Sequence, residues 1–135
     1  AGLKAFVNAE IASGIDLICE VLGMDQHLIG ADLVITGEGR VDASTVYDKA
    51  PVGVARRAKS VGIPVVAIVG SLGQGYEAVY EYGIDAVVPV LDRPMSFEDS
   101  ISMTYELLRA AAERTMRVLK IGGLRDLPQA VNPIS

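Results

Sequence analysis

The sequence is poor in several residue types that would point to particular classes of protein. It has 135 residues with no tryptophan, a single histidine and a single cysteine, Cys19, which excludes an internal disulfide and is typical of the reducing cytoplasm. No apolar run approaches the ~18 residues that suggest a membrane span, although half of the residues are hydrophobic. The first residues also lack the basic start of a signal peptide. We therefore expect a cytoplasmic protein that does not bind a membrane.

Charge and motif content exclude further classes. The formal net charge of −5 argues against a nucleic-acid partner. Cys19 and His27 lie apart in the sequence, so Cys19 is interpreted as a small buried helix residue rather than a nucleophile. The Gly-x-x-x-x-Gly-Lys-Ser/Thr phosphate loop is missing, and neither Gly37-x-Gly39 nor Gly73-x-Gly75 completes a G-x-G-x-x-G motif. A Walker-type ATPase and a classical dehydrogenase are therefore unsupported.

A repeated phrase predicts the fold. Three times a glycine that can end a helix is followed at once by a short apolar, β-branched run, which predicts strands near residues 32–36, 64–69 and 85–90. Helical patterns separate these runs, and such alternation is typical of parallel strands joined by right-handed crossovers. The predicted fold class is α/β, with a parallel sheet flanked by helices in a Rossmann-like or flavodoxin-like arrangement. Pro89 cannot donate to a ladder, so the third strand should be an edge strand or end there.

The helices are predicted at residues 2–10, 13–22, 52–61, 73–82 and 97–120. Capping boxes are expected where Ser13 precedes Asp16 and where Ser96 precedes Asp99. The last helix should bury a stripe, and residues 121–135 should form an irregular tail. The predicted stripe consists of Ile101, Tyr105, Leu108, Ala112 and Leu119. The cations on residues 52–61 are interpreted as a solvated face, namely Arg56, Arg57 and Lys59.

Three parallel strands make too little sheet, because both faces need cover and both edges need partners. The sheet is therefore expected to be incomplete in this fragment and to continue in a missing N-terminal part of the same protein. The sequence does not begin with methionine, and its first residues already have a helical pattern, which also suggests an excised segment. An exposed strand edge would alternatively permit a homodimer.

The segment from Thr36 to Lys49 is the most informative stretch. It follows an apolar run, contains Gly37 and Gly39, and is dense in carboxylates, cations and hydroxyls. The glycines should break the strand and let the backbone approach a ligand at the carboxyl edge of the sheet, where open α/β sheets bind ligands. Pro51 should occupy the first position of the next helix. A solvated turn and a phosphate-handling loop are equally compatible with this chemistry.

This segment resembles a known family. Thr36-Gly-Glu-Gly-Arg-Val-Asp42, with Thr45, Lys49-Ala-Pro51 and Gly53-Val-Ala55 after it, is similar to the signature of the bacterial glycerate kinases. The likeness continues on both sides. It includes Phe6-Val-Asn-Ala-Glu-Ile11, Gly14-Ile-Asp16, Pro64-Val-Val-Ala-Ile-Val-Gly70 and Gly83-Ile-Asp85-Ala-Val. The sequence departs from the family pattern at Ser44, where glutamine is frequent, and at Asp48, where glycine is frequent.

The resemblance implies an enzyme. It implies that residues 1–135 are the C-terminal part of the α/β domain of a two-domain kinase, which transfers phosphate from ATP to D-glycerate with Mg²⁺. The 2-phospho product is favoured, and the fragment alone should be inactive. Two other classes stay open, a non-catalytic module that binds a small anion and a dimerisation domain.

Roles for the residues of the segment follow as hypotheses. Asp42 and Lys49 are the candidate catalytic residues, Asp42 as proton acceptor and Lys49 as a cation for the transferring phosphate. Glu38 and Asp42 are candidate Mg²⁺ ligands, and Gly37 and Gly39 are candidates for ATP binding. The candidates for substrate binding are Thr36, Glu38, Arg40, Ser44, Thr45 and Ser71. The alternative for Glu38 and Arg40 is a structural ion pair.

Overall fold

The computed structural model describes residues 13–47 and 49–122. The predicted helix at 2–10, Asp48 and the tail beyond residue 122 lie outside the described residues. The helices and strands follow one another along the chain as α2 (Gly14–Val21), α3 (Met24–Leu28), β1 (Val34–Val41), η1 (Ala43–Val46), α4 (Ala50–Ser60), β2 (Val65–Leu72), η2 (Tyr76–Tyr82), β3 (Ala86–Pro89), α5 (Phe97–Ser102) and α6 (Thr104–Ile121). None of the helices in this part of the chain is long and apolar enough to cross a membrane.

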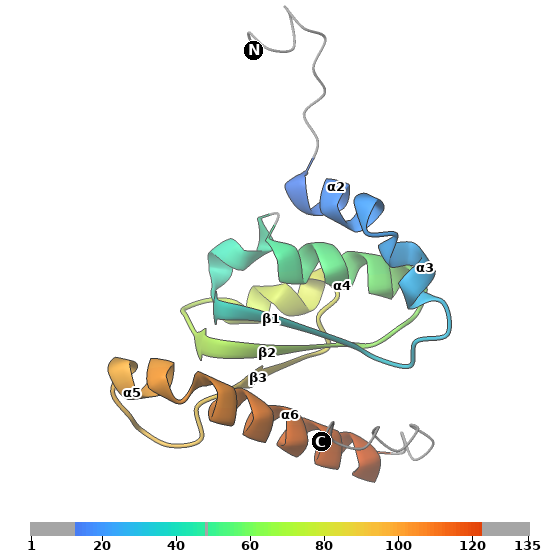
Figure 1. The fold of residues 1–135 in the computed structure, drawn as a ribbon. Coiled ribbons are helices and arrows are strands. Elements are labelled where there is room, and N and C mark those ends of the chain that lie inside the picture. The colour runs from blue at the N-terminus through green and yellow to red at the C-terminus, as the bar shows by residue number, and fades with distance from the viewer. Residues whose placement is uncertain (1–12, 48, 123–135) are drawn as a thin grey trace, which may run out of the picture.

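The three strands form one parallel sheet in the order β1-β2-β3, with β2 in the centre. Val34 pairs with Val65, and Val66 pairs with Ala86. Figure 1 shows α2, α3 and α4 on one side of this sheet and α5 and α6 on the other. The predicted parallel α/β fold is therefore confirmed. Pro89 ends the edge strand β3, as its missing N–H requires.

The face of the sheet toward α4 is closely packed. Val65, Ala67 and Val69 of β2 belong to one buried cluster with side chains of α4 and η2. The other fully or nearly fully buried members are Leu28, Val41, Val46, Val52, Ala55, Ala58, Ile63, Val79 and Ile84. β2 is apolar on both faces, as is expected of a central parallel strand. The main core of the described part therefore lies between the sheet and α4.

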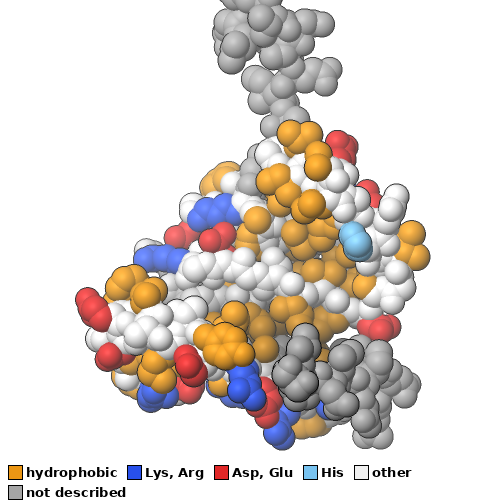
Figure 2. Space-filling view, in the orientation of Figure 1, with side chains coloured by type: hydrophobic (Ala, Val, Ile, Leu, Met, Phe, Trp, Pro, Cys, Tyr) orange, Lys and Arg blue, Asp and Glu red, His pale blue; other side chains and the backbone are white. Residues whose placement is uncertain are grey.

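The face toward α6 is only partly covered. Its buried cluster contains Val66, Ile68 and Ala111 alone. The predicted stripe was mostly wrong, although Ala112 packs partly buried against this cluster. The buried positions of α6 are Leu107, Ala111 and Thr115. They are spaced by four residues, and the Thr115 hydroxyl donates to the Ala111 carbonyl at 2.8 Å. Figure 2 shows apolar side chains at the surface between the sheet and α6.

The predicted helix at 97–120 is two helices. α5 ends at Ser102, and α6 begins at Thr104. The Thr104 hydroxyl donates to the carbonyls of Ser100 and Ile101 at 3.1 and 2.8 Å, so a side chain competes for backbone acceptors at the break. Ser96 caps α5 by accepting from the Asp99 N–H at 3.0 Å, which confirms the Ser96 half of the predicted capping box.

The other predicted cap was wrong. Ser13 occupies the N-cap position of α2 but makes no side-chain cap bond. Its buried hydroxyl has no hydrogen-bond partner among the described residues.

The cations of α4 bind neighbouring elements and do not form a simple solvated face. Arg57 lies 3.1 Å from Asp25 and 3.4 Å from Asp16, so it joins α4 to α2 and α3. The guanidinium of Arg56 lies 5.4 Å from the centre of the Tyr82 ring. These contacts hold the outer helices to α4.

Lys59 fixes the start of β3 in the same way. Its ammonium lies 2.9 Å from Asp85, whose carboxylate also accepts the Val65 N–H at 2.8 Å. Burial raises the pKa of Asp85, but these two hydrogen bonds outweigh it and leave the pKa below its ordinary value. The pair therefore joins α4, β2 and β3 at the amino end of the sheet.

Candidate active site

The segment that follows Ile35 is a strand and not a loop. β1 continues through Gly37 and Gly39 to Val41, and it stays paired with β2 along this length. The expectation that the glycines break the strand was wrong. A Cβ at Gly37 would lie 2.9 Å from the Ile68 carbonyl oxygen, and a Cβ at Gly70 would overlap the Gly39 carbonyl oxygen. Gly37 and Gly70 therefore allow β1 and β2 to approach each other closely.

Gly39 differs from Gly37 in its surroundings. A Cβ built at Gly39 would meet no heavy atom within 4 Å in the described structure. Packing therefore does not explain this glycine, and Gly39 remains the position where a ligand can approach the backbone.

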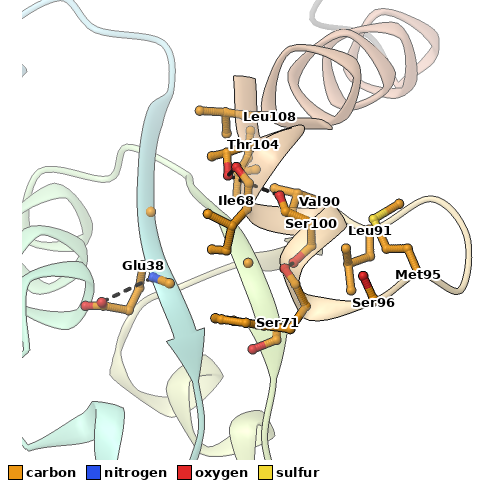
Figure 3. A pocket seen from close by; sticks show the side chains of 15 residues that line it. Glu38, Ile68, Ser71, Val90, Leu91, Met95, Ser96, Ser100, Thr104 and Leu108 are labelled. Atoms are coloured by element: carbon orange, nitrogen blue, oxygen red, sulfur yellow. Dashed lines mark hydrogen bonds between the residues drawn. The ribbon is translucent and has the colours of Figure 1, made fainter. Parts of the chain in front are cut away.

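The pairing of β1 with β2 shows on which face of the sheet the predicted site residues lie. Thr36, Glu38 and Arg40 pair with Ala67, Val69 and Ser71 of β2. Ala67 and Val69 belong to the core under α4, and successive side chains of a strand alternate, so Thr36 and Glu38 lie on the α4 side. Figure 3 shows the Glu38 side chain pointing away from Ile68.

Distance along the strand separates these residues further. Thr36 lies six residues before Asp42, a separation of about 20 Å at ~3.3 Å per residue. The structure therefore does not gather the whole predicted set around one point. It brings together those that lie at the carboxyl end of β1.

Asp42 forms the turn at this end. It is the N-cap of η1, and its carboxylate oxygen Oδ1 accepts the Ser44 N–H at 2.9 Å and the Ser44 hydroxyl at 2.6 Å. The Thr45 hydroxyl accepts the Asp42 N–H at 3.0 Å, which completes a reciprocal capping box. Thr45 is fully buried, whereas Ser44 is exposed. This network holds the Asp42 carboxylate at the end of the strand.

The charges around Asp42 are positive. The Arg40 Nε lies 3.5 Å from the second oxygen of Asp42, Oδ2. The hydrogen bonds from Ser44 lower the pKa of Asp42 below its ordinary value, and the positive charges of Lys49 and Arg40 add to this effect. In the described part of the chain Arg40 pairs with Asp42 rather than with Glu38. The Glu38 carboxylate instead accepts the Gly39 N–H at 3.2 Å.

Lys49 is positioned by the helix that follows. It is the N-cap residue of α4, which continues with Ala50 and Pro51, so Pro51 is the second helical residue rather than the first. The first turn of α4 therefore begins beside the turn that holds Asp42, and the positive end of the helix dipole adds positive potential there.

The second glycine-rich segment lies against the first. β2 extends through Gly70 and Ser71 to Leu72, so the predicted loop at 70–75 is partly strand, and the predicted helix at 73–82 is the shorter 3₁₀ segment η2. The Gly73 N–H donates to the Val41 carbonyl at 2.7 Å, and the Ala43 N–H donates to the Gln74 carbonyl at 3.1 Å. Both segments therefore meet at the carboxyl edge, and Ser71 lies beside Arg40 in the register.

A cavity of about 760 Å³ lies on the opposite face of the sheet, against α5 and α6. Its lining is mainly apolar, with Ile68, Leu91, Ile101 and Leu108 among its residues, and it includes the backbone of Gly39. Figure 3 shows side chains from β2, α5 and α6 around it. The sequence patterns did not predict this cavity, because residues 97–108 are no more hydrophobic than the chain as a whole.

The hydroxyls of this cavity are largely engaged. Ser100 donates to the Phe97 carbonyl at 2.6 Å, and the Ser96 hydroxyl caps α5. The cavity therefore presents mostly apolar surface, in contrast to the charged turn at Asp42.

No group of three or more histidine, cysteine, aspartate or glutamate side chains gathers into a metal site within residues 13–47 and 49–122. Cys19 is buried in α2, as predicted, with its sulfur 3.4 Å from the Met24 sulfur. These observations leave the Asp42 turn as the strongest concentration of functional groups that the structure describes.

The fold and this turn define an open parallel α/β domain with a charged, glycine-lined site at the carboxyl ends of its strands. A sequence model of the glycerate kinase family matches residues 1–120, and the chain belongs to this family. It is 49% identical over 112 residues to a glycerate kinase from Halalkalibacterium halodurans, which covers 83% of this chain and 30% of that protein. It is 38% identical over 122 residues to a glycerate 2-kinase from Escherichia coli, covering 90% of this chain and 32% of the relative.

A solved structure agrees with these relatives. The crystal structure of a protein assigned as glycerate kinase 2 from Salmonella typhimurium LT2 matches with a TM-score of 0.66 and 38% identity, covering 90% of this chain and 30% of that one. The chain thus spans about a third of the length of the relatives that it matches.

Proposed function

We propose that this chain is the C-terminal part of the α/β domain of a longer glycerate kinase, called the parent protein below, which transfers phosphate from ATP to D-glycerate. The carrying observation is the cluster of Arg40, Asp42 and Ser44 at the carboxyl end of β1, with Lys49 beside it. Family membership and the names of the relatives support the substrate. The relative named glycerate 2-kinase supports the 2-phospho product.

In the proposed reaction a hydroxyl oxygen of glycerate attacks the γ-phosphorus of ATP. A new P–O bond forms, the bond from the γ-phosphorus to the β,γ-bridging oxygen breaks, and ADP leaves. The hydroxyl proton passes to a base or to water. Catalysis of such transfers depends mainly on positioning and on stabilising negative charge.

Arg40 and Lys49 supply positive charge at this place. The planar guanidinium of Arg40 suits two-point recognition of the glycerate carboxylate. Lys49, at the positive end of the α4 dipole, suits the negative charge of the transferring phosphate. Arg40 has an exposed side chain, at 65% of its full accessibility, so a ligand can reach it.

For Asp42 the structure favours a permanently charged role. A general base works best when its pKa lies near the working pH, whereas the hydrogen bonds from Ser44 and the nearby cations lower the pKa of Asp42. A carboxylate that stays ionised suits Mg²⁺, which is usually bound by one or two protein carboxylates together with substrate phosphates. Asp42 fits that pattern. Glu38 lies four residues earlier along the extended strand, about 13 Å away at ~3.3 Å per residue, and its carboxylate accepts the Gly39 N–H, so Asp42 is the stronger candidate ligand. Mg²⁺ would neutralise charge on the phosphates when it is bound.

Thr45 is better placed to position Asp42 than to contact substrate, because its side chain is fully buried and bonded to the Asp42 N–H. Ser44 holds the Asp42 carboxylate from the exposed side. Thr36, near the start of β1, is the predicted substrate contact farthest from this cluster along the strand.

An ATP-coupled assay with D-glycerate tests the proposal. The parent protein should turn over, and the isolated 135-residue chain should not, because the sheet of the described residues has three strands alone and the sequence contains no recognised nucleotide loop. Turnover without added D-glycerate, or none in the parent protein, would contradict it.

Two substitutions in the parent protein test the roles. Asp42→Asn should lower kcat by at least about 10²-fold, because it removes a fixed charge that acts on the transition state. Arg40→Ala should chiefly raise the KM for glycerate, since a carboxylate clamp contributes largely uniform binding. If Asp42 binds Mg²⁺, its variant should also need more Mg²⁺ for half-maximal rate. Arg117→Ala, which removes an exposed guanidinium bonded to Glu113 on α6, is the matched control. Near-normal kcat in Asp42→Asn would remove Asp42 from the chemistry.

A further inference from the structure

We propose that Gly73 is a positioning residue, which fixes the side chains of Arg40 and Asp42 by lying directly beneath them. The proposal rests on the proposed function for its kinetic test. Its geometric basis is independent of any reaction, because it depends only on contacts that the described residues make.

The contacts are close. A Cβ added at Gly73 would lie 2.7 Å from the Asp42 Cβ, 2.9 Å from the Arg40 Nε and 3.0 Å from the Arg40 Nη2. Distances below 3.0 Å are essentially never seen for real Cβ atoms, so a methyl group here must displace one or both side chains. Both partners of the ion pair thus lie against one glycine of the loop that follows β2.

Space, and not backbone conformation, requires glycine at this position. Gly73 is not among the glycines with a positive φ in the described residues, which are Gly23, Gly30, Gly62, Gly75 and Gly83. The Gly73 N–H donates to the Val41 carbonyl at 2.7 Å. That bond ties the residue between Arg40 and Asp42 to the loop, so the loop cannot easily withdraw from an added methyl group.

The consequence concerns the geometry of recognition. A guanidinium recognises a carboxylate through parallel hydrogen bonds, and their strength depends on its orientation. A methyl group at position 73 would push the Arg40 Nε and Nη2 away from their present place and disturb the 3.5 Å contact between Nε and the Asp42 Oδ2. Misplacement by about 1 Å can lower a rate by about 10²-fold.

Kinetics of the Gly73→Ala variant of the parent protein test the proposal. We expect kcat/KM for D-glycerate to fall by about tenfold to 10²-fold, mainly through a higher KM. In an Arg40→Ala background the same substitution should have a smaller further effect, because only the contact with Asp42 remains and residues that act through one contact are not additive.

Gly83→Ala is the matched control. Gly83 has a φ of 101°, and its added Cβ would lie 3.1 Å from the Ala55 carbonyl oxygen, so alanine is strained there too. It precedes β3 at the amino edge of the sheet, away from Arg40 and Asp42. We expect a lower melting temperature with kcat/KM for glycerate changed by less than about twofold.

Each result decides the proposal. An unchanged kcat/KM in Gly73→Ala, or an equal loss in the Arg40→Ala background, overturns it. If Gly73→Ala does not fold, restored folding in the double variant supports the contact with Arg40, and continued failure overturns it. If the wild-type parent protein has no glycerate kinase activity, the proposed function fails separately. A crystal structure of Gly73→Ala then decides, because an unmoved Arg40–Asp42 pair overturns the positioning role.

Discussion

The two faces of the sheet differ although the same strands form both. Toward α4, side chains of β1, β2, α4 and η2 make one buried cluster, in which Val52, Val65 and Val79 have no exposed surface. Toward α6, few side chains are buried, and a cavity of about 760 Å³ lies beside Ile68. Ile101 and Leu108 remain 59% and 46% exposed there.

The difference shows that hydrophobicity identifies apolar positions but not the ones that are covered. The central strand β2 is apolar on both faces, yet only one face is closed by the described residues. This agrees with the expectation of an incomplete sheet, and with a chain that spans about a third of the length of its relatives. Four predictions test the contrast, beginning with the largest expected effect.

A matched pair of truncations should separate the two faces most clearly. Ile84→Ala should reduce the free energy of unfolding by about 2–5 kcal/mol, because Ile84 is 1% exposed in the core under α4. Leu108→Ala should change it by about 0.5 kcal/mol, as expected at an exposed site. Denaturant unfolding of this chain measures both. Equal losses would show that the α6 face is as closely packed as the α4 face.

Alanine substitutions at the two glycines of β1, Gly37 and Gly39, should differ in their effect on stability by less than the two truncations do. Gly37→Ala should destabilise by about 1–3 kcal/mol, the usual cost of overpacking, because its methyl group would meet the Ile68 carbonyl oxygen. Gly39→Ala should leave stability unchanged or raise it by about 0.4–1 kcal/mol, since nothing lies within 4 Å of its Cβ position. If a ligand approaches Gly39, Gly39→Ala should in addition raise the KM for that ligand in the parent protein. Similar melting temperatures for both variants would contradict the assignment.

For the helix caps, the larger loss of stability is expected on the side of α5 and α6 rather than on the side of α2 and α4. Ser96→Ala should cost about 1 kcal/mol, because the Ser96 hydroxyl accepts the Asp99 N–H at the start of α5. Ser13→Ala should cost nothing measurable, because the Ser13 hydroxyl has no hydrogen-bond partner among the described residues. Thermal melting compares the two variants. A larger loss for Ser13→Ala would mean that its hydroxyl has a partner outside residues 13–47 and 49–122.

The smallest effect concerns pH. The folded pKa of Asp85 lies below its ordinary value of 3.8, so the unfolded chain binds more protons than the folded chain between the two pKa values. The contribution of Asp85 to the free energy of unfolding is therefore complete above its unfolded pKa and is lost as pH falls through its folded pKa. Asp85→Asn should flatten the decline of the unfolding free energy below about pH 4. The control is Asp92→Asn, because Asp92 forms an ion pair with the neighbouring Arg93. An unchanged acid limb in Asp85→Asn would contradict this account.

Much of the fold could be predicted from local pattern. The glycine-to-strand phrase located all three strands, and the cap at Ser96 was correct, because β-branched runs and cap residues act over a few neighbouring positions. The polar segment was also recognised as a whole, since its composition is unusual. The prediction that its residues form one loop was wrong. Gly37 and Gly39 suggested a loop, and only the pairing of β1 with β2 shows that they continue a strand.

The residues Thr36 to Lys49 by themselves determined which chemical groups are available and which family the chain resembles. Tertiary structure decided which of those groups meet. Asp42 lies beside Arg40 and Ser44 through local geometry, but it rests against Gly73 only because β2 returns beside β1. The buried face of α6 was likewise set by the sheet that it crosses and not by its own periodicity, which offered more than one apolar stripe. Contacts between residues far apart in the sequence leave no periodic signal, and this is the physical reason for the division.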